Sequence, residues 1–257
     1  MHAIRKQTVG ILMGIVSAAL FISLYLWPMW WVLVLGVIIF GIALFAVAPL
    51  ASKEEERTAL YALGGATAIA NILLMMVADQ PYMQRAIIPL AVVMESGIFS
   101  WFSAAGASGS FERKSLRRFM VSCWSWNVFA VLAALFAFDV FFLGAFWSLP
   151  LLLIGSGVCA WVCIQIWQYY YAVKASQLTM WGVVVGVVMF ELIWSIHLLP
   201  LDYMALGFLS AWIWYVLQLF VRFHLSGKGI DWKKQLVFLG ANAVLFAFFL
   251  IYFVRWV

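Results

Sequence analysis

The chain has 257 residues, of which 67% are hydrophobic and 10% are charged. Soluble domains contain roughly 25% charged and roughly 45–50% apolar residues, so this composition excludes a soluble globular protein. The formal net charge of +5 does not indicate nucleic-acid binding, because the basic residues lie in short segments between apolar runs, where membrane topology explains them.

Apolar segments follow one another along the chain, each about as long as a membrane-spanning helix, which needs ~20 residues. Backbone polar groups cannot stay unpaired in lipid, so we expect helices. The expected ranges are 8–27, 30–50, 58–77, 86–104, 119–138, 150–171, 180–199, 203–223 and 235–254. We predict an all-α polytopic integral membrane protein with about nine transmembrane helices, or eight if the first is not a span. They would form a single transmembrane domain over 1–257, with no soluble domain.

Two of the expected turns are very short. Pro28 and Met29 follow the first predicted helix, and Pro200, Leu201 and Asp202 separate 180–199 from 203–223. Such short connections join antiparallel neighbours. Each of these two helix pairs should therefore pack as a hairpin.

Lys and Arg residues divide unevenly between the two ends of the predicted helices. One side holds every Lys and Arg except Arg85 and Arg255. That basic side comprises the N-terminus and the segments 51–57, 105–118, 172–179 and 222–234. Because cytoplasmic loops retain Lys and Arg, we expect a cytoplasmic N-terminus and an outer C-terminus. With no targeting signal recognised, the expected location is the plasma (inner) membrane of a prokaryote, as a multi-pass protein in contact with the lipid bilayer.

Polar residues at the centres of the predicted helices carry the most functional information. They are Glu95, Glu191, Asn127 and Asn242. At a rise of about 1.5 Å per residue, they fall within a few Å of one depth. An acidic residue at the bilayer centre costs roughly 2.5–3.5 kcal/mol on insertion, so such residues usually face the bundle interior. No Lys or Arg is expected at this depth to neutralise either carboxyl.

Two interpretations of the central Glu pair remain open. Desolvation favours the neutral carboxyl, so both acids could hold protons and hydrogen-bond to Asn or Trp. They would then join helices, at about 0.6 kcal/mol per interhelical bond. Alternatively, the pair binds a proton or a cation. Gln165 and Gln218, in the inner halves of their helices, either extend this polar route or serve packing.

The residues that follow Glu191 extend this hypothesis toward the outer side. Trp194 and Ser195 share the helix face of Glu191 by their spacing of three and four residues. His197 lies on a different face, close to Asp202 at the outer end of its helix. If Glu191 exchanges protons with that side, His197 and Asp202 would be the outer relay. The alternative is that both are ordinary interfacial polar residues.

The function that the sequence favours is a small proton- or cation-coupled carrier. Glu95, Glu191, Asn127, Asn242 and Trp194 would bind the ion or substrate, which could be a proton, a cation or an amphipathic small molecule. A non-catalytic subunit or scaffold, bound to membrane partner subunits in a larger complex, is the first alternative. An intramembrane enzyme acting on lipid is the second.

Chemical motifs do not favour the enzyme. No metal-binding or nucleotide-binding motif occurs, and no nucleophile constellation stands out, so we expect no cofactor, no metal site and no catalytic residue. Cys123, Cys159 and Cys163 lie inside predicted helices and are expected to be buried, without a disulfide framework.

Overall fold

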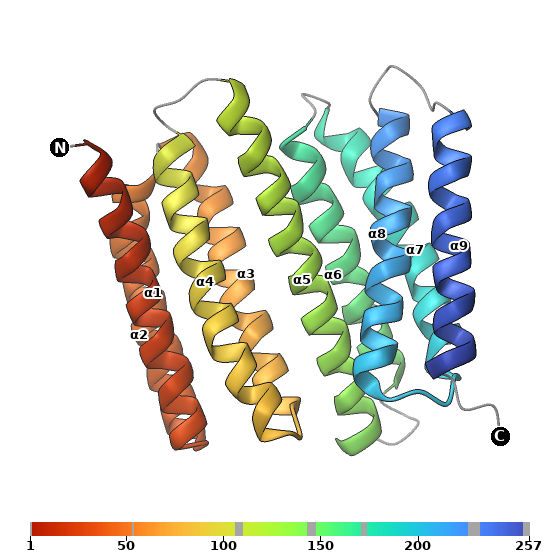
Figure 1. The fold of residues 1–257 in the computed structure, drawn as a ribbon, viewed down its shortest axis with the longest axis horizontal. Coiled ribbons are helices and arrows are strands. Elements are labelled where there is room, and N and C mark those ends of the chain that lie inside the picture. Colours follow the sequence, from red (N-terminus) through yellow and green to blue (C-terminus); the bar gives the residue numbers. More distant parts are fainter. Residues whose placement is uncertain are drawn as a thin grey trace. The chain divides into compact units, whose positions relative to one another are not determined.

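The computed structural model describes residues 2–52, 54–105, 110–142, 148–170, 174–225 and 232–253. Within these ranges the chain forms α-helices and no strand, which confirms the predicted all-α class (Figure 1). The helices are α1 (His2–Leu26), α2 (Trp30–Ala51), α3 (Glu54–Val77), α4 (Pro81–Ala105), α5 (Ser110–Phe142), α6 (Ser148–Gln168), α7 (Ala175–His197), α8 (Tyr203–Leu225) and α9 (Trp232–Phe253).

[[FIG1]]

Eight of these helices, α1 to α8, are long and apolar enough to cross a membrane. The chain is therefore a multi-pass membrane protein. The sequence left open whether the first helix is a span. This helix, α1, is long and apolar enough over Thr8–Leu26. Among the described residues of α9, the apolar stretch is Leu236–Phe249, which is shorter than the spans of α1 to α8. It begins after Lys233 and Lys234 in the sequence.

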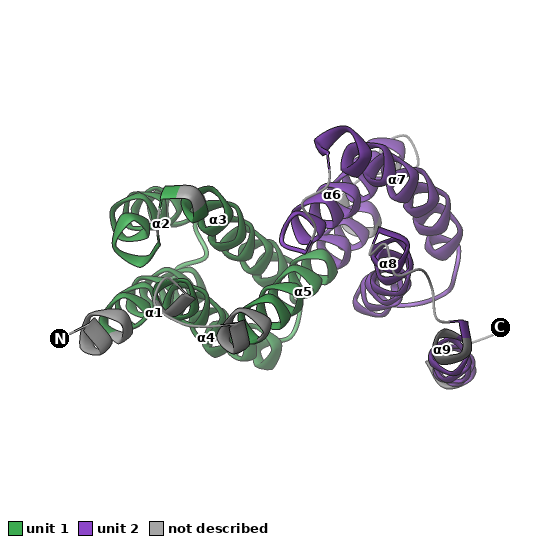
Figure 2. Cartoon of the chain, turned by 90° about the horizontal axis from the view of Figure 1, so that it is seen from above, with its two compact units in different colours: residues 1–130 green, residues 131–257 purple. Residues whose placement is uncertain are grey.

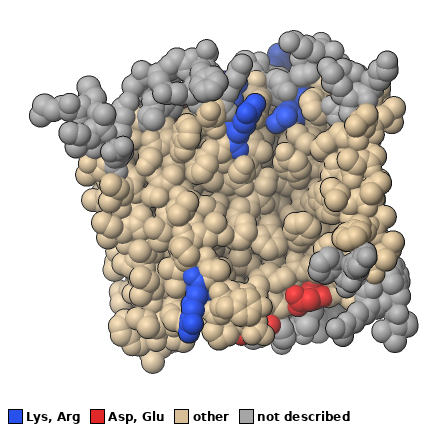
Figure 3. All heavy atoms as spheres, in the orientation of Figure 1, with Lys and Arg blue, Asp and Glu red and all other residues tan. Residues whose placement is uncertain are grey.

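Charged side chains in Figure 3 agree with this assignment. On the face shown there, the Lys, Arg, Asp and Glu side chains of the described residues lie toward the upper and lower edges. The band between these edges is formed by other residue types. A surface of this kind suits hydrocarbon, in which a charged side chain is costly.

[[FIG3]]

Proline positions help to explain where the helices begin and end. Pro28 lies in the turn between α1 and α2, and Pro200 lies between α7 and α8. Pro81 is the first residue of α4, where its missing N–H costs no helical hydrogen bond. The two short turns join α1 to α2 and α7 to α8 as contacting neighbours, as predicted.

The fifth helix is longer than predicted. The sequence assigned 105–118 to a loop, whereas α5 already begins at Ser110. The reason is that Glu, Arg, Lys and Leu, which fill this segment, are strong helix formers. Its apolar span runs from Ser115 to Asp139, so the helix starts before the span does.

Two compact units divide the chain, residues 1–130 and 131–257 (Figure 2). The expectation of a single domain stays a prediction. In the first unit, α1 and α4 lie on one side and α2 and α3 on the other. Contacts join α1 to α2, α2 to α3, α3 to α4 and α4 back to α1, which closes a ring of four antiparallel helices. Residues 110–130 of α5 complete this unit.

[[FIG2]]

Glycines allow α1 and α4 of the first unit to approach each other closely. Gly10 and Gly14 on α1 face Ser96 and Ser100 on α4. A Cβ atom at Gly10 would lie 2.7 Å from the carbonyl oxygen of Ser96, so only glycine allows this approach. Small residues spaced four apart are a common way for membrane helices to pack.

The second unit contains the end of α5 and the helices α6 to α9. Here Gly182 and Gly186 on α7 face α6, and a Cβ at Gly186 would lie 3.3 Å from the Cβ of Ala160. Gly207 on α8 meets the backbone of Ala133 on α5, where an added Cβ would be 2.7 Å away. Both units are thus assembled around small residues.

Candidate functional site

Glu95 lies near the middle of α4 with its side chain 0% exposed. Neither carboxyl oxygen has a hydrogen-bond partner among the described residues. The carboxyl points toward α3, because a Cβ atom added at Gly64 would lie 3.7 Å from its Oε2. Gly64 therefore leaves room for the acid between the two helices.

A hydrogen-bonded set of side chains joins α3 to α5 in the same unit. The Asn127 amide donates from Nδ2 to Oγ1 of Thr67 over 3.0 Å. The indole of Trp126 donates to Oδ1 of Asn71, also over 3.0 Å, and Asn71 in turn donates to the carbonyl oxygen of Thr67 over 2.8 Å. The Oδ1 atom of Asn127 is buried and has no partner among the described residues.

Helix geometry places Glu95 next to this set. Gly64, which faces the Glu95 carboxyl, and Thr67, which accepts from Asn127 of α5, both lie on α3. Thr67 follows Gly64 by three residues, so it lies one turn further on the same face of α3. We call Thr67, Asn71, Glu95, Trp126 and Asn127 the buried polar cluster.

The chemistry of the buried polar cluster is that of an oxygen-rich site. Three buried acceptor atoms, Oε1 and Oε2 of Glu95 and Oδ1 of Asn127, have no donor among the described residues. Leaving one such group unpaired costs roughly 1–3 kcal/mol, and an unpaired buried charge costs far more. A proton on the carboxyl would remove its charge and supply a donor. A hard cation would instead use the oxygens as ligands.

Glu191 and Trp194 have a different environment. Both are exposed, Trp194 by 48%, on the face of α7 opposite to its buried residues. Ser195 shares this face, as predicted, and donates from Oγ to the Glu191 carbonyl oxygen over 2.9 Å. Glu95 belongs to the first unit and Glu191 to the second. A direct meeting of the two carboxyls, and a binding role for Trp194, stay predictions.

Asn242 has partners for both ends of its amide. Its Oδ1 accepts from the Trp212 indole over 2.8 Å, and its Nδ2 donates to the Phe238 carbonyl oxygen over 2.8 Å. The contact holds α9 against α8. A binding role for Asn242 stays a prediction.

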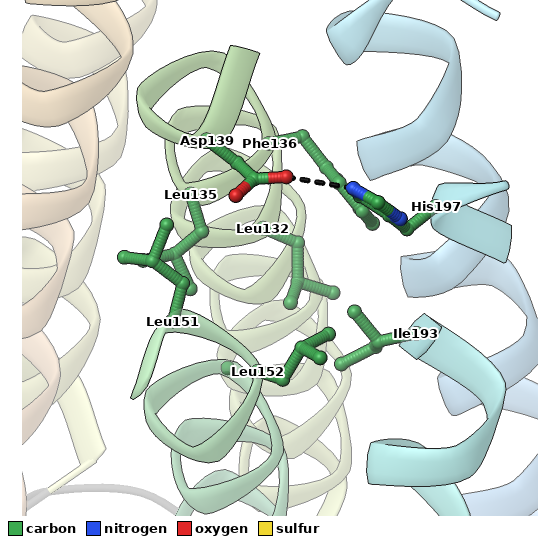
Figure 4. Close-up of a pocket in the computed structure, with 9 residues that line it drawn as sticks. Leu132, Leu135, Phe136, Asp139, Leu151, Leu152, Ile193 and His197 are labelled. Carbon is green, nitrogen blue, oxygen red and sulfur yellow. Dashed lines mark ion pairs between the residues drawn. The ribbon is translucent and has the colours of Figure 1, made fainter. Parts of the chain in front are cut away.

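His197 pairs with Asp139 at the end of α5. Its Nε2 lies 2.8 Å from Oδ2 of Asp139, with the two side chains 39% and 12% exposed (Figure 4). The pair borders a cavity of about 20 Å³ that is otherwise lined by apolar residues and Gly155. This volume suits about one water molecule. The sequence indicated Asp202, and not Asp139, as the acidic residue close to His197.

[[FIG4]]

Asp202 has a local structural contact instead. Its Oδ2 accepts from the backbone N–H of Met204 over 3.2 Å, and its carbonyl oxygen accepts from that of Leu206 over 2.9 Å. These are the contacts of a residue that caps the start of α8. A relay role for His197 and Asp202 stays a prediction.

A second group of buried polar atoms lies in the other unit. Gln218 on α8 is fully buried, and neither end of its amide has a partner among the described residues. One turn before it, Trp214 donates to the Cys159 carbonyl oxygen over 3.1 Å. Gln165 is half-buried.

All three cysteines are buried and form no disulfide, as expected. Within the part of the chain that the structure describes, no three His, Cys, Asp or Glu residues gather as a metal site would require.

Comparison with known proteins identifies no relative. The chain matches no protein-family model, no curated protein and no solved structure. The chemistry of the site therefore rests on the residues described above, and most of all on the buried carboxyl of Glu95.

Proposed function

We propose that the protein is a proton- or cation-coupled carrier and that Glu95 binds and releases the coupling ion. One observation carries this proposal: a fully buried carboxyl whose two oxygens have no hydrogen-bond partner among the described residues, beside another acceptor in the same condition. Intramembrane acids of this kind are typical of ion pathways and proton relays. A proton would neutralise Glu95, and a cation would bind between its oxygens and those of Asn127 and Thr67.

The remaining predicted residues take supporting roles in this proposal. Glu191 is a second protonation site in the other unit, with His197 as its relay to the outer side. Asn242 and Trp194 line the amphipathic part of the substrate path. The distribution of Lys and Arg supports a location in a prokaryotic plasma membrane with a cytoplasmic N-terminus.

Flux measurements test the proposal. Purified protein in liposomes should move protons or a monovalent cation when a gradient is imposed. Glu95→Gln keeps the size of the side chain but removes the ionisable carboxyl, so it should abolish flux while the thermal unfolding curve stays cooperative. Glu54→Gln is the matched control, because Glu54 is an exposed acid in the first turn of α3. Undiminished flux in Glu95→Gln would refute the role of Glu95.

The second candidate is a membrane subunit of a larger complex. It is favoured by the exposed face of α7, where Glu191 would face hydrocarbon at a cost of roughly 2.5–3.5 kcal/mol unless a partner covers it. Under this alternative, Glu191→Gln releases a co-purifying membrane protein, and the wild-type protein alone shows no flux. Under the carrier proposal, Glu191→Gln lowers flux in the purified protein.

A further inference from the structure

A cavity of about 370 Å³ lies in the first unit, where α1 ends, α2 begins, α3 ends and α4 begins. Small-molecule sites commonly have volumes of roughly 300–1,000 Å³, so the cavity is large enough for a ligand. Its lining includes Leu24, Tyr25, Met29, Trp30, Met75 and Gln84.

The lining suits a flexible hydrocarbon chain. It is mostly apolar and contains the thioethers of Met29, Met75 and Met76. Methionine side chains adapt to irregular apolar shapes because they are unbranched and polarisable. The amide of Gln84 is already engaged, because its Nε2 donates to the carbonyl oxygen of Ala78 over 3.0 Å.

A positive charge is fixed at the edge of this cavity. Arg85 donates from Nε to the hydroxyl of Tyr25 over 2.9 Å, and its guanidinium carbon lies 5.9 Å from the centre of the Tyr25 ring. Because Tyr25 lines the cavity, these contacts hold the exposed guanidinium beside it. Four further N–H groups of the guanidinium are available to a phosphate or carboxylate, which arginine binds in a two-pronged geometry.

The sequence also sets Arg85 apart. It is one of only two basic residues expected on the side opposite to the basic loops, the other being Arg255. A topology signal does not account for a basic residue there. An anionic ligand at this end of the first unit would account for it.

We propose that this cavity binds one acyl chain of an anionic bilayer lipid, with the headgroup phosphate on Arg85. The site is separate from the buried polar cluster and does not rest on the carrier proposal. Asp79, on the turn between α3 and α4, is the acidic residue next to this end of the unit. Its charge opposes an anionic headgroup, so Asp79→Asn should strengthen the binding.

Photoreactive lipids test this proposal. Phosphatidylglycerol and phosphatidylcholine, each with the same diazirine-bearing acyl chain, are reconstituted with the full-length protein, irradiated and mapped by peptide mass spectrometry. Adducts on residues 72–76 of α3 are normalised to those on the exposed residues Val244 and Leu245 of α9, which report contact with bulk lipid. The anionic lipid should label the cavity about five-fold more than the neutral one, since a single basic residue is involved.

Variants separate the roles of the charge and of the cavity. Arg85→Ala should make the two lipids label equally, whereas Arg85→Lys should keep most of the preference. Met75→Trp should fill the cavity and reduce labelling by both lipids. Arg222→Ala is the matched control, because Arg222 lies 4.9 Å from the centre of the Tyr170 ring in the other unit. Equal labelling by both lipids in the wild type, or a preference that survives Arg85→Ala, would overturn the proposal.

Discussion

Asn127 on α5 donates a hydrogen bond to Thr67 on α3 over 3.0 Å, one helical turn from Gly64, where the Glu95 carboxyl faces α3. This bond joins two helices that are distant in sequence and gives the buried polar cluster its fixed geometry. The oxygen of the same Asn127 amide remains without a donor among the described residues. A structural bond and an open acceptor thus belong to one side chain.

The first prediction concerns that bond. Thr67→Val keeps the shape of the side chain but removes the acceptor for Asn127, so it should lower the free energy of unfolding by about 0.6 kcal/mol and at most roughly 1.7 kcal/mol. Thr67→Ser retains the hydroxyl and should cost less. Unfolding in mixed detergent micelles measures both changes. Equal losses in the two variants would mean that the methyl group, and not the hydroxyl, matters at this position.

The second prediction concerns the packing of α1 on α4. Gly10→Ala would place a Cβ atom 2.7 Å from the Ser96 carbonyl oxygen, and such overpacking should cost roughly 1–3 kcal/mol. Gly41 on α2 is the matched control, because a Cβ there would meet nothing within 4 Å. Gly41→Ala should be neutral or should stabilise by up to about 1 kcal/mol through helix propensity. The melting temperature should therefore fall in Gly10→Ala and stay constant or rise in Gly41→Ala. Similar shifts in the two variants would contradict the close approach of α1 and α4.

The third prediction concerns the pair of His197 and Asp139. A double-mutant cycle with His197→Ala and Asp139→Asn should give a coupling energy of about 0.2–1 kcal/mol, since the pair is partly exposed. The same cycle with Asp202→Asn should give none, because Asp202 caps α8 instead. If His197 couples as strongly to Asp202 as to Asp139, then Asp202 would be a partner of His197, as the sequence suggested.

Helix positions were predictable because each apolar run is long enough to span a bilayer and ends at a turn or a charged segment. The turn at Pro28 and Met29, for instance, separates α1 from α2 as expected. The burial of Glu95 on the inside of its bundle also agrees with the expectation for a central acid. The start of α5 differs from the predicted loop because the charged residues of this segment, which are typical of loops, are also strong helix formers.

The orientation of a helix about its own axis was harder to predict. Glu95 and Glu191 both occupy central positions, yet Glu95 is buried and Glu191 is exposed. On α7 the buried face is set by Gly182 and Gly186, which face α6. Glu191 follows Gly186 by five residues, which turns it roughly 140° away from that face at 3.6 residues per turn. The spacing of the two glycines was the signal in the sequence that could have indicated this orientation.

Infrared difference spectroscopy on the purified protein tests most directly whether Glu95 exchanges its ion. If Glu95 exchanges its ion, a protonated-carboxyl band should change reversibly with pH or with added cation and should be missing in Glu95→Gln. Glu191→Gln and Glu54→Gln should leave this band in place. A Glu95 band that stays constant over the full range of pH and cation concentration would refute ion exchange at Glu95, because the carboxyl would then hold a permanent, purely structural proton.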